Sequence, residues 1–105
     1  EEEHFKREIK LREELDPTYV LGIEDSFEPE DGQTEFEASL KLFGAEYDIQ
    51  DYKYAIVMPF ADRNLDTIFR SERSSPEQKR VFLRQIAEAI NHLHSKDLVH
   101  GDIKL

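Results

Sequence analysis

A long amphipathic helix is encoded near the C-terminal end of the chain, at residues 75–95. Its start has the signature Ser74-Ser75-Pro76-Glu77, in which a hydroxyl group caps the first turn and proline occupies a position that needs no N–H donor. The helix is predicted to end near Ser95-Lys96. Its apolar stripe follows helical spacing over about five turns, at Phe82, Ile86, Ala89, Ile90 and Leu93.

Composition places this helix in a small and acidic domain. The chain has 105 residues, of which 38% are hydrophobic, and its 24 acidic and 14 basic side chains give a formal net charge of −10. That length allows one domain with one modest core. The charge is uneven, because residues 1–50 have a net charge of −11 and residues 51–105 a net charge of +1. A nucleic-acid partner bound through a basic patch is therefore not expected.

The chain contains no cysteine, so it has no disulfide framework, no thiolate metal site and no cysteine nucleophile. This predicts an intracellular, cytoplasmic protein. No apolar run approaches the roughly 18–20 residues that cross a bilayer, and the opening Glu1-Glu2-Glu3-His4 lacks the basic region of a signal peptide. The absence of an initiating methionine suggests that the natural protein begins before Glu1.

The other elements are predicted from hydrophobic spacing and from turn residues. Residues 36–42 alternate apolar and polar side chains and are assigned to a strand, although so short a window is also compatible with a helix. Pro59 closes a strand, because proline cannot donate to a β-ladder. The predicted order is a helix at 1–15, a strand at 19–27, a turn at 28–33, strands at 36–42 and 54–58 with a loop at 44–53 between them, and a short helix at 65–70.

The end of the chain carries the residues with the clearest chemistry. Directly after the long helix, an apolar dipeptide precedes His100-Gly101-Asp102-Ile103-Lys104. This arrangement resembles the catalytic loop of eukaryotic protein kinases, H-R-D-x-K-x-x-N, with glycine in place of the usual arginine. Phosphoryl transfer to a hydroxyl requires a carboxylate that orients the nucleophile and accepts its proton. A cation beside the carboxylate offsets charge on the transferred group.

The resemblance covers nearly the whole chain, except that residues 29–53 have no clear counterpart in length. Residues 5–17 resemble the kinase αC helix with the loop after it, and residues 56–61 resemble the fifth strand and the hinge. The implied fold is α+β, protein-kinase-like and partial, beginning before Glu1 and continuing past Leu105. The implied divisions are the end of the small lobe at 1–58, the hinge at 59–64, and the start of the large lobe up to the catalytic loop at 65–105.

The resemblance assigns roles to the residues of the catalytic loop. Asp102 is the catalytic base, and Lys104 contacts the transferred phosphate, since a lysine at that position is typical of kinases that act on Ser or Thr. His100 and Gly101 are structural residues of the loop. Gly101 replaces the arginine that binds an activation-loop phosphate in many kinases, so the resemblance does not extend to control by such a phosphate.

The resemblance also implies residues that bind ATP. Glu8 corresponds to the αC glutamate that pairs with the ATP-positioning lysine, and Glu13 and Glu14 compete for that role. At the hinge, backbone groups hydrogen-bond the adenine and a gatekeeper residue lies behind it. The hinge positions are Met58 as the gatekeeper, followed by Pro59, Phe60 and Ala61.

Several parts of the kinase pattern are absent from residues 1–105. They lack the Gly-rich loop, the ATP-binding lysine, the catalytic-loop asparagine and the Asp-Phe-Gly that binds Mg²⁺. The complete domain would use ATP and Mg²⁺ to phosphorylate Ser or Thr hydroxyls of a protein substrate. This piece alone holds no metal ligand and is expected not to transfer phosphate.

Two other interpretations stay open. His-Gly-Asp also resembles the catalytic loop of small-molecule kinases that act on aminoglycosides and choline, although Lys104 and the hinge spacing argue against them. A pseudokinase-like interaction module would keep the fold without the reaction. The sequence indicates neither the protein substrate nor the oligomeric state.

Two further expectations concern the long helix. It should pack on large-lobe helices that this chain lacks, so Phe82, Ile86, Ile90 and Leu93 are expected to be partly exposed. His92 and His94 lie two positions apart and diverge by roughly 200° around the helix. They cannot form a metal pair of the i,i+4 kind and are treated as ordinary helix residues.

Overall fold

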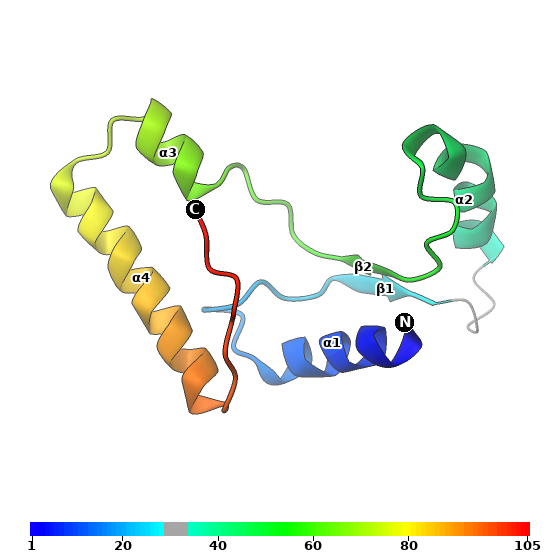
Figure 1. The fold of residues 1–105 in the computed structure, drawn as a ribbon, viewed down its shortest axis with the longest axis horizontal. Helices are drawn as coiled ribbons and strands as arrows, with labels where there is room; N and C mark the ends of the chain where they lie inside the picture. Colours follow the sequence, from blue (N-terminus) through cyan, green and yellow to red (C-terminus); the bar gives the residue numbers. More distant parts are fainter. Residues whose placement is uncertain (29–33) are drawn as a thin grey trace. The chain divides into compact units, whose positions relative to one another are not determined.

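The computed structural model of the chain describes residues 1–28 and 34–105 (Figure 1). These residues divide into two compact units, one made of residues 1–13 and 22–59 and the other of residues 14–21 and 60–105. No helix in this part of the chain is long and apolar enough to span a membrane. The element order is α1 (Glu2–Glu14), β1 (Asp25–Phe27), α2 (Thr34–Tyr47), β2 (Ala55–Val57), α3 (Leu65–Ser71) and α4 (Pro76–Ser95).

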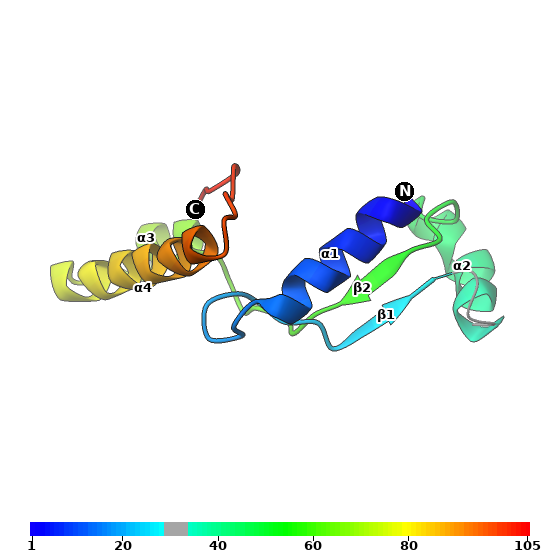
Figure 2. The same cartoon turned by 90° about the horizontal axis from the view of Figure 1, so that it is seen from below.

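The first unit is a two-stranded antiparallel sheet with α1 lying alongside it (Figures 1 and 2). β1 pairs with β2 so that Ser26 lies opposite Ile56. Phe5 of α1 is 9% exposed, and its ring centroid lies 4.9 Å from that of Tyr54. The core of this unit is therefore small and centres on the contact between α1 and the segment that enters β2.

The strand predicted over 19–27 is wrong at its start, because only Asp25–Phe27 pair with β2. The backbone N–H groups of Tyr19 and Val20 both donate to the carbonyl of Asp16, at 3.0 and 3.1 Å. That turn prevents an extended conformation, and it places residues 14–21 in the second unit. The predicted strand at 54–58 is present but shorter, at Ala55–Val57.

The strand predicted over 36–42 is wrong, because these residues lie within helix α2. Phe36, Leu40, Phe43 and Tyr47 are spaced to share one helix face. Phe36 anchors this face, since its ring stacks on Phe27 with a centroid distance of 5.0 Å. The alternation in the sequence arises because Ala38 and Leu42 add apolar positions on another side of the helix. The start of the predicted loop at 44–53 is also helical, and residues 29–33 of the predicted turn lie outside the described residues.

The second unit contains α3 and α4, joined through aromatic contact. The rings of Phe69 and Phe82 lie 6.0 Å apart. Asn64 caps α3 by accepting the N–H of Thr67 at 2.9 Å. The predicted exposure of the α4 stripe is confirmed, because its large apolar residues are all intermediate between buried and exposed. Part of the stripe borders an open cavity of about 490 Å³, whose lining includes Tyr19, Phe82 and Ile86.

Candidate active site

Helix α4 carries the candidate site at its C-terminal end, and its own start is firmly capped. The Ser75 hydroxyl accepts the N–H of Gln78 at 3.2 Å, while the Gln78 side chain accepts the N–H of Ser75 at 2.9 Å. This capping box satisfies two N–H groups that have no partner within the helix. The helix start predicted from Ser74-Ser75-Pro76-Glu77 is confirmed.

The end of α4 is a Schellman motif built on aspartate rather than glycine. Asp97 has a φ of 58°, its N–H donates to the His94 carbonyl, and the N–H of Leu98 donates to the Leu93 carbonyl, both at 3.0 Å. Aspartate is one of the few non-glycine residues that adopt this conformation readily. The motif turns the chain away from the helix axis, and the C-terminal segment then runs back toward α3 (Figures 1 and 2).

The structure brings four of the predicted site residues together in this C-terminal segment. The N–H of Asp102 donates to His100 Nδ1 at 3.1 Å, which assigns the acceptor role to that ring nitrogen. Gly101, between them, has a φ of 79°, a conformation that a side chain such as arginine would strain. Lys104 Nζ lies 3.4 Å from Asp102 Oδ2. Glycine at position 101 therefore suits the backbone that places a carboxylate beside a cation.

The Asp102–Lys104 pair is open to reactants. The side chain of Lys104 is 78% exposed and that of Asp102 is 77% exposed. An exposed ion pair contributes little to stability, so this pair is poorly explained as a structural device. Chemically it offers a carboxylate that can accept a proton and an ammonium group that can stabilise a developing negative charge.

His92 has a contact that the sequence did not predict. Its Nε2 accepts the backbone N–H of Asp16 at 3.0 Å, and its ring lies 5.1 Å from that of Tyr19. The contact joins the turn at 14–21 to α4 within the second unit. The two partners lie 76 positions apart, and no local sequence pattern indicates a contact over such a separation. His92 is thus a structural anchor that lies eight positions before His100.

Asp16 is held in its ionised form by the same turn. Its carboxylate accepts the N–H of Thr18 at 2.9 Å. The pKa of Asp16 is lowered from its ordinary value, mainly by this backbone hydrogen bond, then by a hydrogen bond from the Thr18 side chain, with a smaller contribution from His92.

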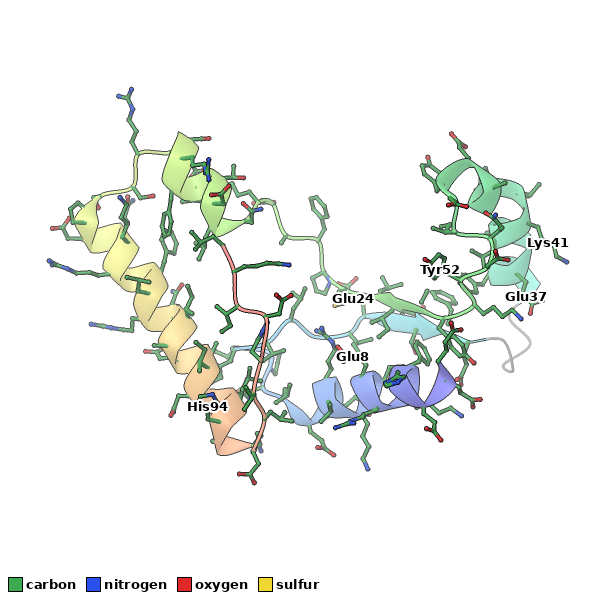
Figure 3. All side chains as sticks on the ribbon, viewed as in Figure 1. Glu8, Glu24, Glu37, Lys41, Tyr52 and His94 are labelled. Carbon is green, nitrogen blue, oxygen red and sulfur yellow. The ribbon has the colours of Figure 1, made fainter. Side chains whose placement is uncertain are left out.

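The residues predicted to bind ATP are divided between the two units. Glu8 belongs to the first unit, where its carboxylate accepts from Arg12 Nε at 2.7 Å and its side chain is 48% exposed (Figure 3). Met58 and Pro59 close the first unit, and Met58 is 39% exposed. Phe60 and Ala61 begin the second unit, and Phe60 is 93% exposed.

The segment predicted to be the hinge has backbone hydrogen-bonding groups available. Within residues 1–28 and 34–105, the N–H and carbonyl of Ala61 form no hydrogen bond. These groups fit the donor and acceptor that an adenine ring requires. The same described residues contain no cluster of three or more His, Cys, Asp or Glu side chains that could hold a metal ion. The Ala61 backbone therefore fits an adenine contact, whereas the described residues do not by themselves fit a Mg²⁺ site.

The protein kinase domain family matches this chain over residues 1–105. The chain belongs to the protein kinase family. It is 28% identical over 104 residues to NUAK family SNF1-like kinase 1 of Homo sapiens, with 97% of this chain and 13% of that protein covered. It is 29% identical over 98 residues to mitogen-activated protein kinase p38b of Drosophila melanogaster, with 93% of this chain and 24% of that kinase covered.

This kinase chain thus spans 13% to 24% of the length of these curated relatives. No solved structure matches it significantly. The α+β arrangement of a small sheet, α1 beside it and the helical second unit is consistent with a partial kinase fold.

Proposed function

We propose that this chain is the part of a Ser/Thr protein kinase that carries the catalytic carboxylate, Asp102. The observation that carries the proposal is the loop after α4, where Asp102 and Lys104 form an exposed pair at 3.4 Å in a chain of the kinase family. In this role, Asp102 orients the hydroxyl of a protein substrate and accepts its proton, and Lys104 stabilises the transferred phosphoryl group.

The other loop residues act as positioning residues. His100 accepts the Asp102 N–H and so holds the backbone of the catalytic residue. Gly101 supplies the positive φ that this geometry needs. ATP bound to the complete kinase supplies the phosphoryl group, and the family uses it together with Mg²⁺. In this chain, Met58 as the gatekeeper and the hinge positions Pro59 to Ala61 would hold the adenine.

The lobe divisions and the role of Glu8 belong to the same proposal. Residues 1–58 form the end of the small lobe, 59–64 the hinge and 65–105 the start of the large lobe. The boundary of the two compact units between Pro59 and Phe60 supports the division at the hinge, although residues 14–21 group with the second unit. Glu8 would exchange its present partner Arg12 for the ATP-positioning lysine of the complete kinase. Family membership and the lack of cysteine support an intracellular location.

The test is phosphorylation of a generic basic protein by the natural protein that contains this chain. Asp102→Asn should lower the rate by about a hundredfold or more, because proton transfer to the base is lost. ATP binding should be unchanged. Asp97→Asn is the matched control, because it makes the same chemical change five positions earlier at a φ that asparagine tolerates.

Three results would count against the proposal. Full activity of Asp102→Asn would remove Asp102 from the reaction. Phosphorylation of a small metabolite and of no protein would indicate a small-molecule kinase. Absence of any phosphoryl transfer by the natural protein, with the fold intact, would indicate an interaction module.

A further inference from the structure

The last turns of α2 present aromatic side chains to solvent. Phe43 is 59% exposed and Tyr47 is 67% exposed. They share a helix face with Phe36 and Leu40, which are half-buried. One apolar stripe therefore runs along α2 from the core of the first unit to an uncovered end. Exposed aromatic residues on one continuous face are typical of interaction sites.

The uncovered end of α2 has a defined shape. The carbonyl of Gly44 accepts the N–H of Ile49 at 2.8 Å, and Asp48 between them has a φ of 55°. Gly44 is buried, and a Cβ atom built on it would lie 2.9 Å from the Cα of Gln50. The chain after α2 thus packs closely against the helix. A preformed surface of this kind loses less conformational freedom when a partner binds.

Charge around the exposed aromatic residues is predominantly negative. Glu46, Asp48 and Asp51 lie within a few positions of Tyr47, and the last turn of α2 contains no basic residue. The carbonyl end of a helix also carries a partial negative charge, which a cation would stabilise. The lysines of this region, Lys41 and Lys53, instead line a separate cavity of about 280 Å³ beside the earlier part of the stripe.

We propose that Phe43, Tyr47, Glu46, Asp48 and Asp51 form a docking surface, the α2 surface, for a basic amphipathic helix of a partner protein. The apolar face of that helix would cover Phe43 and Tyr47. Its Lys or Arg side chains would meet the three carboxylates and the carbonyl end of α2, and Arg could also stack on the aromatic rings. This surface lies in the segment that lacks a kinase counterpart in length, so the proposal does not rest on the proposed catalytic function.

The probe is a fluorescein-labelled amphipathic Leu/Lys peptide about 18 residues long, titrated with the 105-residue chain and followed by fluorescence anisotropy. Binding should weaken about tenfold or more in the variant F43S/Y47S, as for removal of interface hot spots. Leu42→Ser is the matched control, because Leu42 is 75% exposed but lies away from the stripe, and it should leave binding unchanged.

Charge is tested separately with E46K/D51K. This variant should bind the Leu/Lys peptide more weakly than the unmodified chain does. It should also bind a Leu/Glu peptide of the same pattern, which the unmodified chain should not bind. Both sets of substitutions are at exposed positions, and circular dichroism verifies that the helix content is retained.

Three outcomes would overturn the proposal. The first is equal binding of the Leu/Lys peptide to the unmodified chain and to F43S/Y47S. The second is equal binding of both peptides to the unmodified chain. The third is sedimentation showing that the chain self-associates through Phe43 and Tyr47 and that the peptide does not compete, because a second copy would then be the occupant. A negative result in the peptide-binding test would not affect the role proposed for Asp102, because the kinase assay tests a different residue and measures phosphoryl transfer.

Discussion

Helices α2 and α4 end in the same backbone conformation, but the segments that follow them differ in chemistry. Each has an aspartate at positive φ, 55° for Asp48 and 58° for Asp97. In each, the following N–H returns to a carbonyl five positions earlier, at 2.8 Å after α2 and 3.0 Å after α4. A loop with an exposed carboxylate and cation follows α4, whereas a return to β2 follows α2. The motif therefore sets the direction in which the chain leaves each helix, and the neighbouring residues determine the chemistry of the segment that follows.

The two helices differ in how well their own sequences support them. α4 has a capping box, a proline in the first turn and two histidines in the last turn. α2 has acidic residues in its first turn but has no basic residue in its last turn. We therefore expect α4 to be coupled to the candidate active site and α2 to be separate from it.

The largest effect is expected from proline in the helix interiors. Ala87→Pro in α4 removes a helix hydrogen bond and introduces a clash, costing about 3 kcal/mol, and it should abolish kinase activity in the natural protein. Ala38→Pro should cost a similar amount in α2 but leave activity intact. Loss of helicity is measured by circular dichroism and activity by phosphate transfer. Equal loss of activity in both variants would contradict the separation.

A smaller effect is expected where α2 meets the chain that follows it. Gly44→Ala places a methyl group 2.9 Å from the backbone of Gln50, so the neighbours must shift. The free energy of unfolding should fall by about 1–3 kcal/mol, the usual cost of overpacking. Gly22→Ala is the control, since a Cβ there meets nothing within 4 Å. If urea midpoints of the two variants coincide, the close approach after α2 is not present in solution.

The N-terminal cap of α4 is expected to contribute less to the free energy of unfolding than the close packing at Gly44. Ser75→Ala removes the acceptor of the Gln78 N–H and should cost about 1 kcal/mol. Ser74→Ala changes the neighbouring serine, which is outside the capping box, and should leave the urea midpoint nearly unchanged. A larger loss for Ser74→Ala than for Ser75→Ala would mean that the helix begins elsewhere.

The smallest effect concerns the pKa of Asp16, which is lowered chiefly by the Thr18 N–H. Because the folded pKa lies below the unfolded value, the stabilisation is present above the ordinary pKa of 3.8 and is lost as pH falls through the folded pKa. Asp16→Asn should therefore show a shallower acid loss of stability than the unmodified chain, with Asp51→Asn as the control. NMR titration should place the Asp16 pKa below its ordinary value.

Much of α4 and its loop was predictable because independent signals agreed. The cap, the stripe and the turn residues all indicated the same helix, and His100 to Lys104 follow it directly. α2 was misassigned because apolar residues on two sides of the helix imitate strand alternation over a short window. The contact of Asp16 with His92 was not predictable, since it joins residues 76 positions apart. Residue types reveal local geometry better than they reveal partners distant in sequence.

The aspartates that end α2 and α4 show a second limit of residue patterns. Glycine usually marks the positive φ that ends a helix, and neither Asp48 nor Asp97 carries that signal in the sequence. The positive φ of Gly101 suits the departure from the kinase pattern at that position. One substitution in the loop thus has a backbone explanation that a motif comparison alone did not supply.

The most direct test of the central claim is a structure of the natural protein with an unreactive ATP analogue, Mg²⁺ and a Ser-containing peptide. We predict that an Asp102 carboxylate oxygen lies within about 2.6–3.2 Å of the substrate hydroxyl, with Lys104 turned toward the terminal phosphate. A structure in which Asp102 stays paired with Lys104, away from both the hydroxyl and the nucleotide, would contradict it.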